Sequence, residues 1–506
     1  MTRTIPAFES LAELADACGQ VPGHEPWPRI VVDAALWRRL GRQLAQGQWA
    51  LLGLWGDTGR VHAALADAEG LLVATLECPD GRFDSLAAVH PPALRLERAI
   101  RDLWGYEPVG LPDTRPWLDH DRWGVLQPHG AATEVPATGA DYPFLPAEGE
   151  SLHQIPVGPV HAGIIEPGHF RFTANGETVV RLEERLGYVH KGIEKLLAGA
   201  DLMRGAELAG RCSGDSTVAY ALAFSRAVEA ALGVEAPPRA HWLRALMAEL
   251  ERLANHLGDI GAVCNDAAFA ILHAHCGVLR ERVLRAADAA FGHRLMRDRI
   301  VPGGIVGDVD SKGFAAIAAV IDEIERRFPA LSELYENTAS LQDRTAGTGI
   351  LEPGLAARYA AGGFVGRASG RAFDARRFAA YPPYTRLAFP VPVLKAGDVD
   401  ARVRIRMLEV DASLSLVRQI LERLPPGELW VTLPAGAGEG LALVEGFRGD
   451  VLAWVRVASG RIERCHLRDP SWFQWPLLEA AIDGNIVADF PLCNKSFNCS
   501  YSGHDL

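Results

Sequence analysis

The sequence predicts an α+β protein: a small N-terminal α/β domain followed by a mainly helical domain with peripheral antiparallel strands. Three patterns predict this class. A helix and apolar strands occupy the N-terminal part, long amphipathic helices recur through the middle of the chain, and alternating apolar segments frame those helices. Because one core usually stops growing at about 250–300 residues, a chain of 506 residues should hold two unequal units.

The N-terminal unit is predicted from a change of period along the chain. DAALWRRLGRQLAQG (33–47) has apolar residues at helical spacing, whereas WALLGLWGD (49–57) and VHAALADAEGLLVATLEC (61–78) are typical of strands. A further helix, LRLERAIRDLWG, stops at Gly105. We therefore expect a first domain over residues 1–125.

A linker and a second domain follow. Residues 126–150 are rich in Pro, Gly, Ala and Thr without periodicity, which predicts an interdomain linker. The second domain, 151–506, should open with a β-hairpin over 164–190 that turns at Asn175–Gly176. Long packed helices are predicted over 241–292, 314–328 and 401–424, and antiparallel strands with a turn at Gly460 over 442–469.

Composition narrows the class of function. The net charge of -12 disfavours a nucleic-acid surface, because phosphate binding needs a basic footprint. No run of about 20 apolar residues occurs, and the N-terminus lacks the order of a signal peptide, so a cytoplasmic protein is expected. The eight cysteines form neither a dense disulfide framework nor any CxxC pair.

Seven segments occur in the order of a known family: GPVHAGIIEPGHFRF, GYVHKGIEKL, LERLANHLGDIGA, VPGGI, DRTAGTGI, VGRASG and DPSW. Through them the second domain resembles the large subunit of nickel–iron hydrogenases and the 49-kDa subunit of respiratory complex I, in wording closest to the formate-hydrogenlyase branch. The first domain, through ERAIRDLWGYEPVGLPDTRPW, is similar to the complex I 30-kDa subunit. The resemblance implies a hydrogenase-large-subunit-like fold on the inner face of the cell membrane.

The family's nickel–iron centre is held by two CxxC pairs, because thiolates bind low-valent nickel and iron strongly. At the first pair, RxCGxC, this chain has Arg211-Cys212-Ser213-Gly214-Asp215-Ser216, so Ser213 and Ser216 replace both thiolates. At the second pair, Cys493 followed by Ser496 is the best fit. Hydroxyls are hard donors that keep their protons, so we expect no nickel–iron centre and no hydrogen evolution. The alternative is another metal among Cys212, Cys493 and Cys499.

In the complex I branch the vacated cavity accepts a quinone head group, and the resemblance carries this role over to two residues. His169 matches the quinone-side histidine, and Asp266 aligns with its acidic partner. Such a pair could relay a proton to a reduced carbonyl. The alternative is that His169 is a hydrogen-bonded core histidine. The branch's quinone-side tyrosine has no counterpart here, because RCSGDS occupies its region.

Four further residues complete the expected site. Glu166 and His504 match family positions near a magnesium ion, although a Glu and a His so far apart in sequence are more often surface or structural groups. Arg448 matches the arginine over the metal cavity, where it could polarise a ligand or neutralise Asp450 and Asp215. Polar residues such as Asp215 at former ligand positions imply a wetter cavity.

Three functions follow from the resemblance. The first is a peripheral oxidoreductase subunit that takes electrons from a small iron–sulfur subunit, acts with a quinone, and adjoins integral membrane subunits of an ion-translocating arm. The second is a non-catalytic scaffold in the same complex, and the third is an active hydrogenase. No cofactor is expected on the chain itself apart from magnesium, and the iron–sulfur cluster should lie on the partner. No GxGxxG fingerprint suggests NADH binding.

Overall fold

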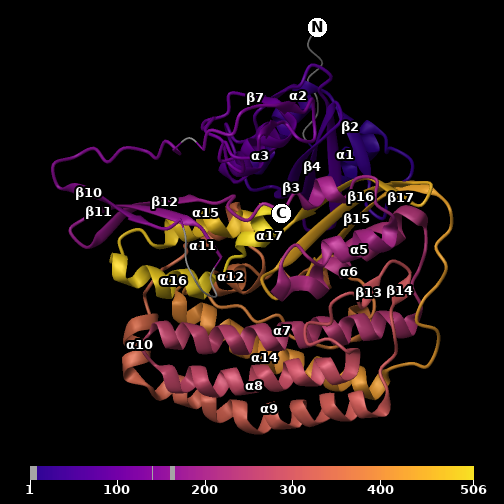
Figure 1. Ribbon diagram of the computed structural model, residues 1–506, viewed down its shortest axis with the longest axis vertical. Helices are drawn as coiled ribbons and strands as arrows, with labels where there is room; N and C mark the ends of the chain where they lie inside the picture. The colour runs from indigo at the N-terminus through magenta and orange to yellow at the C-terminus, as the bar shows by residue number, and fades with distance from the viewer. Residues whose placement is uncertain (1–7, 140, 160–165) are drawn as a thin grey trace.

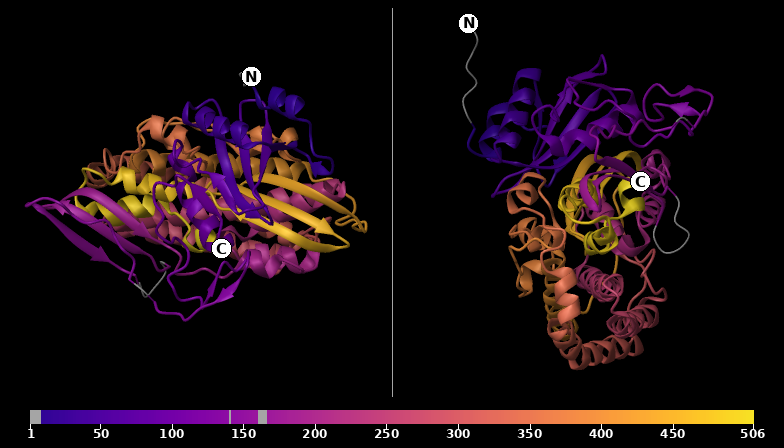
Figure 2. Two further views of the ribbon diagram at one scale, coloured as in Figure 1. Left: turned by 90° about the horizontal axis from the view of Figure 1, so that it is seen from above. Right: turned by 90° about the vertical axis from the view of Figure 1, so that its left-hand side faces the viewer.

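The computed structural model describes residues 8–139, 141–159 and 166–506. Three levels are visible (Figure 1): an N-terminal unit at the top, a central sheet with the C-terminal helices, and a layer of long helices at the bottom. The same order is seen from the side (Figure 2). This arrangement confirms the α+β class predicted from the sequence.

The N-terminal unit is a four-stranded sheet of order β2-β5-β4-β3, in which β2 runs parallel to β5 and the other pairs are antiparallel. The predicted helix 33–47 is α2, which begins after Asp33, whose carboxylate accepts the Leu36 amide. The predicted stop at Gly105 is confirmed, since this residue ends α3 with a φ of 73°. The elements are α1 (Leu11–Cys18), β2 (Arg29–Val32), α2 (Ala34–Ala45), β3 (Ala50–Asp57), β4 (Arg60–Ala66), β5 (Leu71–Glu77) and α3 (Leu94–Trp104).

The predicted β-hairpin is present as β11 (His169–Asn175) and β12 (Thr178–Arg185), joined at Asn175–Gly176. Gly176 has a φ of 58°, the left-handed conformation that favours glycine in such a turn. A third strand, β10 (Leu152–Val157), pairs with β11. Sequence reasoning missed β10, because its mostly part-exposed residues carry little apolar alternation.

Four long helices form the bottom layer. The predicted stretch 241–292 divides into α7 (Pro238–Asp266) and α8 (Ala270–Phe291), and the other two predictions correspond to α9 (Ser311–Asn337) and α14 (Val399–Arg423). Leu250, Leu253 and Leu257 of α7 are fully buried, so the apolar face of this helix forms the core of the layer. Figure 1 shows α7, α8 and α9 stacked one below the other.

The central sheet joins the two predicted units. Its antiparallel strands β15 (Ala437–Glu445), β16 (Asp450–Ala458) and β17 (Arg461–Arg468) confirm the predicted C-terminal strands, and β1 (His24–Glu25) adds a parallel strand from the N-terminal unit. One apolar cluster contains Trp37 of the first unit together with Trp475 and Phe490 of the second. The units therefore share a core, while the boundaries at 125 and 150 stay predictions.

The chain ends between the N-terminal unit and the layer of long helices (Figure 1). Among residues 8–139, 141–159 and 166–506, no helix is long and apolar enough to span a membrane. The helices used below are α5 (Leu202–Ala209), η2 (Gly214–Ser216), α6 (Thr217–Leu232), α11 (Pro353–Arg358), α12 (Gly363–Ala368), α13 (Ala375–Phe378), α15 (Ser471–Ala481), α16 (Phe490–Phe497) and α17 (Tyr501–Asp505).

Candidate functional site

A cluster of hydroxyl groups forms where the loop between α5 and α6 meets the C-terminal segment. Ser213 donates a hydrogen bond of 2.7 Å to Asp215, and its Oγ lies 3.0 Å from Oγ of Ser500. Ser213 and Ser216 are both buried. Two segments 287 residues apart thus meet at Ser213, a position that the family resemblance associates with metal ligation.

Arg448 covers this cluster from the turn between β15 and β16. Its Nη1 and Nη2 each lie 2.7 Å from one carboxylate oxygen of Asp215, and its Nε donates to the Asn498 carbonyl at 2.5 Å. Burial alone would raise the pKa of Asp215, but the charge and hydrogen bonds of Arg448 outweigh it and lower that pKa to about 2. Arg448 therefore neutralises Asp215, one of the two roles expected for it.

The second pair of positions differs from the predicted one. Ser500, rather than Cys493, contacts Ser213. Gly503 lies beside it, because a Cβ added at Gly503 would be 2.8 Å from Oγ of Ser500. Ser500 and Gly503 are three residues apart, as the two cysteines of a CxxC pair are. Cys493 and Ser496 lie instead on α16, where Ser496 donates to the Cys493 carbonyl and accepts from Arg402. The CxxC-like spacing of Ser500 and Gly503 was the signal in the sequence that could have found them.

This set of donors does not fit a nickel–iron centre. It offers three hydroxyls and one glycine, and a Cβ at Gly503 would clash with the Asp469 carboxylate. Asp469 in turn accepts a hydrogen bond of 2.8 Å from Tyr220. Hard, protonated oxygen donors cannot replace four thiolates. Within the described part of the chain, no three His, Cys, Asp or Glu side chains are placed to hold another metal.

His169 and Asp266 are not brought together. His169 begins β11, and its Nε2 lies 3.3 Å from Nε of Arg171, while Phe144 packs at 4.6 Å between ring centroids. Burial and the charge of Arg171 lower the pKa of His169. Asp266 is exposed at the end of α7. The neighbour of His169 is thus a cation, so the carboxylate-assisted proton relay expected from the sequence does not form here.

Glu166 and His504 each form hydrogen bonds with other groups of the protein. His504 is fully buried, its Nδ1 is 2.8 Å from Asp505, and its Nε2 accepts from Trp117 at 3.3 Å. Glu166 accepts the Ser502 amide at 2.9 Å. Both nitrogens of the His504 ring therefore have protein partners, which leaves this imidazole without a lone pair for magnesium.

Glu251 is a carboxyl group that sequence reasoning missed, because it lies among ordinary helical positions of α7. It accepts the first amides of α6, Val218 at 2.7 Å and Ala219 at 3.1 Å. Burial raises the pKa of Glu251 to about 8, with a contribution from the charge of Asp215. A cavity of about 240 Å³ adjoins both carboxyl groups. The rest of the lining combines apolar residues, including Leu250, Leu284 and Met296, with the polar side chains of Asn255, Arg280 and Arg294.

Glu251 should make stability depend on pH. The folded chain keeps the proton up to about pH 8, whereas the unfolded chain releases it near 4.5, so stability falls as pH rises through this window. The slope is about 1.4 kcal/mol per pH unit. Glu251→Gln should remove this component, which urea unfolding at pH 5.5 and pH 8 can measure. The exposed control Glu333→Gln should keep the wild-type slope, and an unchanged slope in Glu251→Gln would refute the assignment.

Comparisons with known proteins agree on one family. Residues 270–435 match the model of the 49-kDa subunit of respiratory-chain NADH dehydrogenase. The chain is 31% identical to formate hydrogenlyase subunit 5 of Escherichia coli, over 84% of this chain and 77% of that protein. It is 32% identical to the carbon monoxide-induced hydrogenase of Rhodospirillum rubrum (69% and 98%). It is also 31% identical to one of the NADH-quinone oxidoreductase subunits of Dehalococcoides mccartyi (66% and 92%).

A solved structure is similar as well. A chain in the structure of the membrane-bound sulfane sulfur reductase, described as an archaeal respiratory membrane complex, matches with a TM-score of 0.67 at 26% identity. The match covers 71% of this chain and 99% of that chain.

Proposed function

Because the chain belongs to the family of hydrogenase large subunits and complex I 49-kDa subunits, we propose that it is the peripheral large subunit of a membrane-bound oxidoreductase that works without a nickel–iron centre. It receives electrons from an iron–sulfur cluster on a small partner subunit. The chain lies at the inner face of the cell membrane, where integral membrane subunits couple this electron transfer to ion translocation.

The observation that carries the proposal is the hydroxyl cluster under Arg448. Ser213, Ser216 and Ser500 hold hydroxyls where the family pattern calls for thiolates, and the Arg448–Asp215 ion pair occupies the space beside them. Nickel–iron chemistry needs the soft donors that this site lacks. The chain keeps the segments of the family in their order, which supports the proposal that it still assembles into a complex as a large subunit.

The cavity beside Asp215 and Glu251 suits the head group of a quinone. The apolar part of its wall favours a planar ring, and Glu251, with a pKa of about 8, holds a proton that it can give up near neutral pH. A quinone takes up two electrons, supplied by the cluster of the partner, and two protons. Glu251 passes protons from the solvent to the carbonyl oxygens in turn. It takes the role that the sequence suggested for His169.

The electron-transfer role is tested by purifying the tagged chain from solubilised membranes of its own cells. We expect a small iron–sulfur subunit and membrane proteins to co-purify, nickel far below one atom per chain, and no hydrogen uptake with a redox dye. A parallel purification of an intact nickel–iron hydrogenase is the positive control. Stoichiometric nickel with dye-linked hydrogen uptake would contradict the proposal, and so would a chain that purifies without any partner.

The quinone step is tested in the purified complex with a short-chain quinone. Glu251→Gln should lower kcat by about 100-fold, the usual size of a general acid contribution, while His169→Ala should keep kcat near the wild-type value. A non-catalytic scaffold predicts that both variants keep full turnover. That outcome would assign the reduction to the partner subunits.

A further inference from the structure

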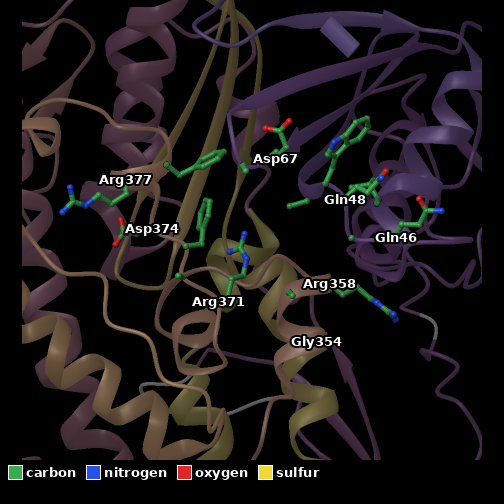
Figure 3. A pocket seen from close by; sticks show the side chains of 18 of the residues that line it. Gln46, Gln48, Asp67, Gly354, Arg358, Arg371, Asp374 and Arg377 are labelled. Carbon is green, nitrogen blue, oxygen red and sulfur yellow. The ribbon is translucent and has the colours of Figure 1, made fainter. Parts of the chain in front are cut away.

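A large cleft separates the N-terminal unit from the helices of the second unit (Figure 3). Its volume is about 770 Å³, within the range of small-molecule sites, which is about 300–1,000 Å³. One wall comes from the end of α2 and the loop that leads into β3, with Gln46, Gln48 and Trp49. The opposite wall comes from α11 and the segment that leads from α12 into α13. The cleft is separate from the hydroxyl cluster described above.

Three arginines line the cleft: Arg358, Arg371 and Arg377. Figure 3 shows Arg371 directed into the middle of the cleft, with Arg358 and Arg377 at its two sides. In a chain with a net charge of -12, three cations around one cleft mark a local positive potential. The cleft therefore attracts anions.

Arg371 is a cation with little compensation from the protein. Its Nη1 donates to the Ala361 carbonyl at 2.9 Å, and its guanidinium lies 4.3 Å from the ring centroid of Phe373. Burial lowers the pKa of Arg371 to about 10. Among the residues that the structure describes, no carboxylate forms an ion pair with it, and the nearby Asp450 and Glu445 are bonded to Arg468 and Arg367.

Two carboxylates, Asp67 and Asp374, also line the cleft, and the three arginines leave an excess of positive charge. Asp67 faces Arg371 across the cleft in Figure 3, but its oxygens accept the amides of Leu11, Glu69 and Gly70. Asp374 is paired with Arg376. Arg358 is exposed on α11 and forms no ion pair within the described part of the chain.

Arg377, at the other side, uses its guanidinium on the protein itself. It donates to the Phe389 carbonyl at 2.6 Å and lies over the ring of the same residue. Arg377 therefore contributes positive charge at the edge of the cleft, whereas Arg371 is the group that can bind an anion in the middle.

We propose that this cleft binds a phosphate-bearing ligand, whose phosphate pairs with Arg371 and whose remaining part contacts the amides of Gln46 and Gln48. A planar guanidinium with free N–H groups is suited to bidentate contact with phosphate oxygens. Phe373 and Phe378 supply an apolar wall for an organic group attached to the phosphate. The ligand lies between the two units, so it stabilises their contact. This inference does not depend on the proposed electron-transfer function.

The proposal is tested on the purified full chain by calorimetry with pyrophosphate and ADP, and by flotation with phosphatidylglycerol vesicles against phosphatidylcholine vesicles. Arg371→Gln should weaken binding at least about tenfold, because it removes a charge-assisted pair worth about 1.4 kcal/mol or more. Arg358→Gln, exposed at the edge, should weaken it about threefold. The control Arg326→Gln makes the same change of charge on the remote helix α9 and should bind like wild type.

Each outcome decides the proposal. Saturable binding of pyrophosphate or ADP that depends on Arg371 supports a soluble ligand. Binding of phosphatidylglycerol vesicles alone, with the same dependence, assigns the cleft to a lipid phosphate. Absence of binding to all probes overturns the proposal, as does binding that neither Arg371→Gln nor Arg358→Gln weakens. Arg358→Gln keeps the test decisive if Arg371→Gln unfolds, because its side chain is exposed.

Discussion

Arg367→Met is expected to lower the free energy of unfolding by about 3–5 kcal/mol, the usual cost of breaking a buried ion pair by removing one partner. Arg367 lies in α12 with a side chain that is 1% exposed. It donates to Glu409 at 2.8 Å, to Glu445 at 2.9 Å and to the Phe373 carbonyl at 2.8 Å. Methionine would leave these acceptors buried without their cation. The shift of the urea midpoint measures the effect.

Two variants check the cause of this loss. Arg367→Lys keeps the charge but loses the planar set of N–H donors. It should therefore lower the free energy of unfolding, but by less than Arg367→Met does. Arg204→Met breaks an exposed ion pair with Glu207, whose side chains are 57% and 45% exposed, and should cost at most about 0.5 kcal/mol. If Arg367→Met and Arg204→Met lowered the free energy of unfolding equally, the buried ion pairs of Arg367 would contribute no more to stability than an exposed ion pair.

Arg448→Met is expected to lower the free energy of unfolding by about 2 kcal/mol. The side chain of Arg448 is 6% exposed, whereas that of Asp215 is 37% exposed, so water compensates part of the charge left on Asp215. The pKa of Asp215 should rise, because the guanidinium that lowers it is gone while burial still raises it. Thermal and urea unfolding of the purified chain measure the loss.

A double-mutant cycle separates the ion pair from the other contacts of Arg448. Asp215→Asn removes the charge but keeps the shape, so Arg448→Met combined with Asp215→Asn should be more stable than the sum of the single losses predicts. The coupling free energy should be about 1–2 kcal/mol. Strict additivity would mean that Arg448 acts through the Asn498 carbonyl and Ser216 alone.

Much of the fold was predictable because its signals are local. The helix 33–47 needs only its own apolar stripe and the cap at Asp33, and the hairpin needs only alternation and Gly176. By contrast, β1 was not predictable, because its two residues are held by β15 from the far end of the chain. The shared core of Trp37 and Trp475 is likewise a long-range contact.

The candidate site divides in the same way. Ser213 and Ser216 were identified from their motif, because the residue type at each position of RCSGDS can be compared directly with a thiolate pattern. The register of the second pair was not, because several residues between 493 and 503 fit the spacing. In the folded chain the residue next to Ser213 is Ser500, and the Oγ atoms of the two serines lie 3.0 Å apart. His169 and Asp266 match the motifs of a pair but have different neighbours in space.

The family frame and the long amphipathic helices follow from the sequence alone, as does the presence of hydroxyl side chains, Ser213 and Ser216, where the resemblance predicts soft metal ligands. The tertiary structure decided which of these groups act together. It paired Arg448 with Asp215 across 233 residues, placed Glu251 at the start of α6, and left Arg371 in a cleft between the two units. The physical reason is that donor type belongs to each residue, whereas charge pairing and the pKa of a carboxyl depend on neighbours that packing brings together.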